Sequence, residues 1–444
     1  MIKAGAARID ITPDYPVWMD GMIRAHPSTG VHDPVFAKAL VFGEDDNPAR
    51  YFIIISLDVC LMAAEECAAM RAQIEKQWGV PASQVIIAAI HNHSGPATVA
   101  KYAPPADLPL RDKYLEQLRG WVQKAVAKAW KDRRPARAGY ASGHEDTISH
   151  YRRLLADDGQ VVMNWEEFPP ERLVGPLGEI DPEVGVLRFV DLADEQRNLA
   201  VLFNYACHPN VLSGDNYLIT AEYPGRAEQL LERELGGQAV FVNGAQGTMD
   251  IDGLRDRDWE GLERIGQALA GAVRSALPDA VAQDALPLCG ATAFYTVPAR
   301  KVSDQEFEWA QGILKVSQGI VKPLADGVGD DYKAKLLDSL RKVQDQPVPL
   351  EQVGIALGDC AIVSFPGELF TEIGREIKAH SPFKHTWLIG LANGSIGYVP
   401  TRRAIKEGGY AVSVRRVDAA AEDIVIKQSL ALLNRMYAMA GANK

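Results

Sequence analysis

The sequence lacks the marks of membrane, secreted and disulfide-bonded proteins. None of its apolar runs approaches the roughly 20 residues that span a bilayer. The segment after Met1 also lacks the apolar run that forms the core of a signal peptide. The five cysteines are scattered and form no CxxC pair, so we expect them to pack as small hydrophobic side chains. These absences predict a reduced, cytoplasmic protein without membrane insertion.

Positive charge is also in deficit. The 47 lysines and arginines against 58 acidic residues give a formal net charge of -11, and the basic runs 131–137 and 401–406 are short. Proteins that bind phosphate backbones carry basic surfaces, so we exclude nucleic acid as a partner. We expect a small-molecule substrate instead, and the sequence leaves the oligomeric state open.

Proline, glycine and serine show no excess that would indicate disorder. Apolar, β-branched segments alternate with amphipathic ones, which is typical of an α/β fold. The pattern predicts strands at residues 51–58, 84–91, 199–206 and 238–243, a strand pair around 354–364, and helices at 63–78, 111–131, 224–235, 259–277, 304–316, 331–343 and 419–436. We expect one catalytic domain over residues 1–444, with a mixed β-sheet core flanked by helices and a helical insertion near 300–350.

Polar side chains follow several of the predicted strands at the point where each strand ends. They are His91 and His93 in the segment HNHSGP, His208 in NYACHP, Glu368 in FPGE and Tyr398 in GYVPT. Two imidazoles and a carboxylate around an open position are the usual protein ligands of a hydrolytic zinc ion. Each residue also has a purely structural interpretation: a hydrogen-bonded loop histidine, a glutamate that favours a helix dipole, or a core tyrosine.

Together these segments resemble the neutral, non-lysosomal ceramidase family in its amino-terminal catalytic domain. The similarity runs from ARIDITP (Ala7–Pro13) through HNHSGP, NYACHP and FPGE to GYVPT, and HxHSGP is its most specific part. The resemblance implies a metal site at strand ends. One zinc ion, with Mn²⁺ or another divalent ion as the alternative, would be held by His91, His208, Glu368 and Tyr398.

The same resemblance implies residues that face the substrate. His93 and Tyr410 match by position, and the family's arginine falls on Arg152 or Arg153 of SHYRRL, between which the sequence does not choose. Two departures stand out. Asp250 occupies the position of a serine that the family's ceramidases carry, and we expect no carboxyl-terminal immunoglobulin-like domain in this chain.

These features predict a metal-dependent hydrolase that cleaves an amide-like (N-acyl) bond with zinc-activated water, on a small polar substrate rather than ceramide. His93 would act as acid and base, while Arg153 and Tyr410 would stabilise the oxyanion. Asp250 would orient a ligand or bind a polar substrate group, or else only form a turn. Two alternatives stay open: a metal-dependent esterase, lactonase or hydrolase of a sugar-linked group, and a non-catalytic binding protein of the same fold.

Overall fold

Two β-sheets stacked face to face form the centre of the molecule, whose computed structural model describes residues 1–99 and 105–442. The larger sheet runs, from edge to edge, β14 (Gln238–Asn243), β12 (Asp194–Tyr205), β11 (Glu183–Asp191), β6 (Arg134–His144), β1 (Ile2–Asp10), β3 (Phe36–Glu44), β4 (Tyr51–Leu57) and β5 (Val85–Ala89). The smaller sheet runs β16 (Leu288–Val297), β17 (Val348–Leu357), β18 (Cys360–Ser364) and β20 (His385–Ile389). Each contains parallel and antiparallel pairs, which confirms the expected mixed sheet.

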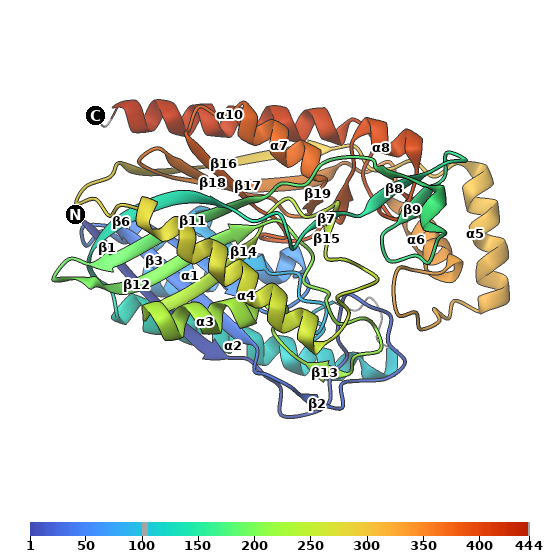
Figure 1. The fold of residues 1–444 in the computed structure, drawn as a ribbon, viewed down its shortest axis with the longest axis horizontal. Coiled ribbons are helices and arrows are strands. Elements are labelled where there is room, and N and C mark those ends of the chain that lie inside the picture. The colour runs from blue at the N-terminus through green and yellow to red at the C-terminus, as the bar shows by residue number, and fades with distance from the viewer. Residues whose placement is uncertain (100–104, 443–444) are drawn as a thin grey trace.

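Helices cover the two outer faces of this stack (Figure 1). The larger sheet packs against α1 (Ala64–Trp78), α2 (Leu108–Lys131), α3 (Glu222–Leu235) and α4 (Trp259–Ala276), and the smaller against α7 (Thr371–Ala379) and α10 (Ala421–Ala442). The layers are therefore helix, sheet, sheet and helix, which confirms the α/β class. In the described part of the chain, no helix combines the length and the apolar character needed to cross a membrane.

The predicted strands and helices are found with small shifts at their ends. The predicted strand pair is β17 and β18, and its turn places Gly358 at a φ of 60°, where glycine avoids the strain of a side chain. The predicted helix at 304–316 is α5 (Asp304–Ser317), which begins with a capping box between Ser303 and Glu306. Its neighbour α6 (Asp330–Val343) packs against it through Leu336, Leu337 and other apolar residues.

The connection between α5 and α6 returns to the main body of the fold. The backbone N–H of Leu324 donates to the carbonyl of Ile23 at 2.9 Å, and the N–H of Gly214 donates to the carbonyl of Ala325 at 2.9 Å. Backbone hydrogen bonds of this kind fix the position of a loop. The residues after Leu324 are therefore held against the loops that follow the strands of the larger sheet.

Several short strands close the edge at which β5, β12, β14 and β18 end. They are paired as β19 (Glu368–Leu369) with β21 (Tyr398–Val399), β15 (Met249–Asp250) with β7 (His150–Tyr151), β2 (Gly30–Val31) with β13 (Leu218–Ile219), and β8 (Arg153–Ala156) between β10 (Leu173–Pro176) and β9 (Val161–Met163). In the parallel pair of β19 and β21, Glu368 lies directly opposite Tyr398. Polar groups from distant parts of the sequence therefore meet at one edge.

Candidate metal centre

Both histidines of HNHSGP turn toward the same point at this edge. His91 follows β5 with a φ of 71°, a left-handed conformation that is rare for a residue with a side chain and is often found at functional sites. The turn brings Nε2 of His91 to 3.2 Å from Nε2 of His93. Gly21, at a φ of 95°, leaves room for this arrangement, because a Cβ there would overlap the His93 ring.

The two histidines expected to bind metal are oriented by backbone carbonyls. Nδ1 of His91 lies 3.0 Å from the carbonyl oxygen of Cys60, and Nδ1 of His208 lies 2.8 Å from that of Met249. A carbonyl only accepts, so in the neutral form of each ring Nδ1 carries the proton and Nε2 is the nitrogen that can bind a metal. Histidine ligands of metals are commonly held in this way.

The carboxylate of Glu368 completes the cluster. Its Oε2 lies 3.3 Å from Nε2 of His91 and 3.4 Å from Nε2 of His208, and Nε2 of His208 lies 3.4 Å from the Tyr398 hydroxyl. Glu368 is only 5% exposed, and within the described residues this Oε2 has no hydrogen bond of acceptable angle despite those short distances. A buried carboxylate oxygen of this kind calls for a cationic partner.

These distances fit a tetrahedral zinc ion. Ligand atoms that each lie about 2.0–2.1 Å from one tetrahedral centre are about 3.3 Å from one another. The donor atoms of His91, His208 and Glu368 all lie within 4.8 Å of one another. The nitrogen and oxygen donors, their spacing and their burial therefore suit a zinc-like divalent cation.

A second donor set, Cys60 with His91 and His93, shares one residue with the first. The Cys60 sulfur lies 3.5 Å from Nδ1 of His91, the nitrogen that already faces a carbonyl. Burial raises the pKa of the Cys60 thiol even though His91 opposes the shift. Metal binding requires a thiolate, so the set that contains Glu368 is the better site.

The surroundings of Glu368 keep its carboxylate in the ionised form that can bind a cation. Burial alone would raise the pKa of Glu368, but His91 and His208 outweigh it and hold that pKa well below the usual value. Burial lowers the pKa of His93, and His91 and His208 lower it further, so His93 is neutral at neutral pH. Burial raises the pKa of Tyr398 although Arg152 opposes it, and a bound divalent cation would favour the ionised phenol.

The structure separates the two arginines that the sequence left open. Arg152 lies beside the cluster, with one guanidinium nitrogen 3.2 Å from Nε2 of His208, another donating to the carbonyl of Gly247 at 2.7 Å, and its centre 5.1 Å from that of the Tyr398 ring. Arg153 points away and pairs with Glu407 at 3.0 Å. Successive residues of an extended chain face opposite sides. Of the two arginines, Arg152 therefore lies beside the cluster, and Arg153 does not reach it.

This difference predicts contrasting effects of two matched substitutions. Arg152→Met should lower kcat/KM by about 100-fold or more, because a positioned donor to developing negative charge is removed. Arg153→Met should affect mainly thermal stability, since its partners belong to the segment around α8 (Arg402–Glu407). Steady-state kinetics with thermal unfolding curves checks both. Equal kinetic losses in the two variants would contradict the assignment.

The remaining predicted residues border the cluster. Tyr410, at the start of α9 (Tyr410–Ser413), has its ring 6.0 Å from that of Tyr398. Asp250 is fully buried, accepts from Nδ2 of Asn210 at 3.4 Å and lies 3.7 Å from a guanidinium nitrogen of Arg152. Asp250 therefore lies next to the arginine that contacts His208.

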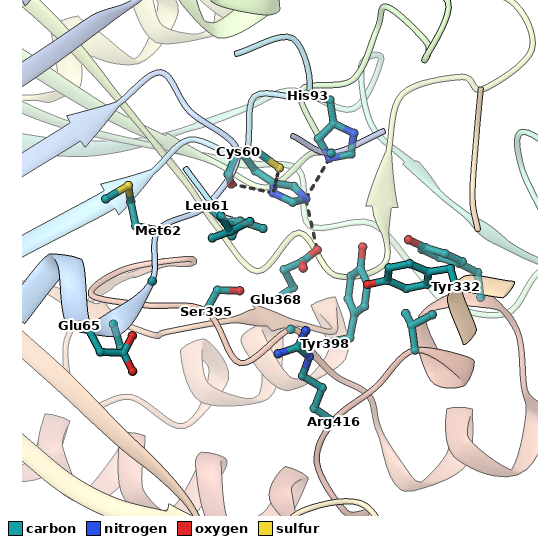
Figure 2. A pocket seen from close by; sticks show the side chains of 18 residues that line it. Cys60, Leu61, Met62, Glu65, His93, Tyr332, Glu368, Ser395, Tyr398 and Arg416 are labelled. Atoms are coloured by element: carbon teal, nitrogen blue, oxygen red, sulfur yellow. Dashed lines mark hydrogen bonds and ion pairs between the residues drawn. The ribbon is translucent and has the colours of Figure 1, made fainter. Parts of the chain in front are cut away.

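A cavity of about 510 Å³ opens onto the cluster, and its floor includes His91, His93 and Glu368. Figure 2 shows Glu65 and Arg416 on its walls, together with Leu61, Met62, Ser395 and Tyr332. The sequence analysis did not single out Glu65 or Arg416, since neither stands in a recognisable motif. The cavity is large enough for a small organic substrate and presents both apolar and charged groups.

Comparison with known proteins identifies the relatives of this chain. The family profile "Neutral/alkaline non-lysosomal ceramidase, N-terminal" matches residues 3–253. Neutral ceramidase of Pseudomonas aeruginosa is 25% identical over 246 residues, covering 54% of this chain and 35% of that protein. Neutral ceramidase B of Dictyostelium discoideum is 25% identical over 220 residues, covering 48% and 29%. The matched segments therefore span about a third of the length of these relatives.

The solved structures extend the match to nearly the whole chain. The crystal structure of neutral ceramidase from Pseudomonas aeruginosa aligns with a TM-score of 0.74 at 19% identity, covering 98% of this chain and 75% of that one. A structure described as ceramidase complexed with C2 aligns with a TM-score of 0.72 at 18% identity, with the same two coverages. The shared fold thus includes the segments that carry Glu368, Tyr398 and Tyr410, which lie beyond the family match.

Proposed function

Because the chain belongs to the neutral/alkaline non-lysosomal ceramidase family, we propose that it is a metal-dependent hydrolase of an amide (N-acyl) bond. One zinc ion would be held by His91, His208, Glu368 and Tyr398. The observation that carries the proposal is the convergence of two oriented Nε2 atoms on a buried carboxylate at 3.3 and 3.4 Å. This donor set matches hydrolytic zinc sites.

The side chains around the cluster have roles that follow from their positions. A divalent ion at this site would acidify a coordinated water and polarise a carbonyl. His93, neutral and buried, lies within reach of the same point through Nε2, so it can accept a proton and pass it to a leaving nitrogen. Arg152 and Tyr410 would stabilise negative charge on the substrate oxygen.

We further propose that the preferred substrate is small and polar rather than a long-chain ceramide. The cavity walls carry the charged side chains of Glu65 and Arg416, which can bind polar substituents of a substrate. Asp250, a carboxylate in place of a hydroxyl, adds a further charge next to Arg152. Short N-acyl compounds with polar substituents suit such walls.

The test is a substrate panel with defined metal content. Purified protein is stripped with a chelator, reloaded with zinc or manganese, and assayed against short N-acyl amides, a ceramide, short esters and lactones. We expect amide hydrolysis that the chelator abolishes and zinc restores, with short polar amides preferred over the ceramide. Turnover of esters or lactones alone would contradict the amide assignment. Absence of metal-dependent turnover on every substrate would favour a binding protein.

A further inference from the structure

Two side chains of opposite charge, Glu65 and Arg416, line the cavity that opens onto the metal centre and lie outside the metal cluster. In the described part of the chain, neither side chain makes a hydrogen bond or an ion pair, and they do not pair with each other. The neighbouring Glu66, in contrast, accepts both arms of the Arg119 guanidinium at 2.7 and 2.8 Å. Glu65 and Arg416 are therefore available to a ligand in the cavity.

The two charges stand on separate and well-anchored parts of the fold. The carbonyl of Arg416 accepts from the backbone N–H of Arg300 at 2.9 Å, and the N–H of Asp418 donates to the carbonyl of Pro298 at 2.9 Å. Glu65 lies in the first turn of α1, which packs on the larger sheet. In Figure 2 the guanidinium of Arg416 points toward Glu368, and Glu65 lies on a different wall.

This arrangement distinguishes substrates by the signs of their charges. A substrate with one charge is attracted by one wall and repelled by the other, whereas a substrate with both charges can be attracted by both. The planar guanidinium of Arg416 matches a carboxylate, and the carboxylate of Glu65 accepts hydrogen bonds from an ammonium group. Leu61 and Met62 line the same cavity and offer apolar surface to the chain between the two groups.

We propose that the cavity selects dipolar amides, in which an ammonium group faces Glu65 and a carboxylate group faces Arg416. The inference rests on the proposed amide hydrolysis and names its substrate class. Water adds across the C–N bond of such an amide, so the products are a carboxylic acid and an amine. Glu65 and Arg416 are then specificity-determining residues of the reaction.

Two kinds of amide carry both charges. A dipeptide has one charge on each side of the bond that is cleaved, whereas an Nε-acyl-lysine has both charges on its amine arm. The test therefore uses two sets of amides, each with a member that has both charges, members with either charge alone and a member with neither. The first set is Nε-hexanoyl-L-lysine, N-hexanoyl-6-aminohexanoate, N-hexanoyl-1,5-diaminopentane and N-hexanoylpentylamine. The second set is L-leucylglycine, N-(4-methylpentanoyl)glycine, L-leucyl methylamide and N-methyl-4-methylpentanamide.

For the zinc-loaded enzyme we expect the dipolar member of at least one set to have about a tenfold higher kcat/KM than each member with a single charge. The reason is that a site that binds a charged group rejects the analogue without it. Arg416→Gln should remove the advantage that the carboxylate gives and keep the advantage that the ammonium group gives. Glu65→Gln should do the reverse. A general loss of stability cannot produce these opposite effects.

The matched controls are Arg435→Gln and Glu75→Gln, which change exposed residues of α10 and α1 that do not line the cavity. They should leave every ratio unchanged. The inference is overturned if, in both sets, the dipolar member is no better than one of its single-charge analogues. It is also overturned if the advantage of the dipolar member survives Arg416→Gln or Glu65→Gln.

If none of the amides is hydrolysed, the proposed function has failed, and the binding of the same two sets to the zinc-loaded protein decides the inference separately. Ligand-observed NMR measures this binding. Tighter binding of the dipolar member that both Arg416→Gln and Glu65→Gln weaken would support the inference. Equal binding within both sets would overturn it.

Discussion

Replacing His208 by alanine should strip the metal from the protein and lower kcat/KM for amide hydrolysis by about 1,000-fold or more. A bound ion contributes several kcal/mol to the transition state, and each 1.36 kcal/mol is about tenfold in rate. His208 is 1% exposed and its Nδ1 is held by the Met249 carbonyl, so its Nε2 is a preset ligand that the alanine variant lacks. Elemental analysis of the dialysed variant, together with kinetics in excess zinc, measures both losses.

Two controls separate a lost ligand from a damaged fold. His380→Ala changes an exposed histidine at the end of α7 and should leave metal content and rate unchanged. Tyr398→Phe should weaken metal binding without abolishing it, because two imidazoles and a carboxylate remain. Stoichiometric zinc in a His91→Ala, His208→Ala double variant would refute the site.

The strands that the sequence predicted are those whose side chains are apolar on both faces. β4 and β5 read YFIIISL and VIIAA, and both are buried throughout. In contrast, β6 (RPARAGYASGH) and much of β1 are built from alanine, glycine and arginine, whose strand propensity is low. They become strands because β1 pairs with β3, β6 pairs with β11, and the two pair with each other. These pairings join segments that are distant in the sequence.

The candidate site was predictable as a set of strand-end residues but not as a geometry. His91, His208 and Glu368 each follow a buried strand, which the sequence pattern shows. The left-handed turn at His91 and the pairing of Glu368 with Tyr398 across β19 and β21 depend on contacts between distant segments. The choice of Arg152 over Arg153 needed the path of the chain between β7 and β8.

Away from the site, a buried ionic network should dominate the response of stability to mutation. Lys38 lies between two carboxylates, with Nζ at 2.6 Å from Asp58 and 2.7 Å from Glu228, and all three side chains are at most 3% exposed. Lys38→Met should reduce the free energy of unfolding by about 3–5 kcal/mol, because it leaves buried charges without a partner. Lys3→Met, which removes a pair with the exposed Asp46, is the matched control and should cause no measurable loss.

The deficit of Lys38→Met should grow as the pH rises. Burial raises the pKa of Glu228 to about 8 and raises that of Asp58, while Lys38 opposes both shifts. A group whose pKa is higher in the folded than in the unfolded state contributes fully to stability below its unfolded pKa. This contribution is lost as the pH rises through the folded pKa. Without Lys38 both folded pKa values rise further, so protonation relieves the buried charges at low pH and the deficit is smaller there than at high pH. Urea unfolding at about pH 5 and pH 8 measures the difference, and equal deficits would contradict the network.

Lys38→Met should also weaken metal binding at about pH 8, although Lys38 touches no metal ligand. The Asp58 side chain accepts from the backbone N–H of Phe36 at 2.8 Å, and its carbonyl accepts from Nδ2 of Asn92 at 3.3 Å. Asn92 lies between His91 and His93, so the network holds the chain that delivers both imidazoles. A supporting interaction of this kind typically changes metal affinity by about 10–100-fold. Zinc titration of folded Lys38→Met and Lys3→Met at about pH 8 tests this coupling. Unchanged zinc affinity in Lys38→Met would mean that the network affects only the global stability of the protein.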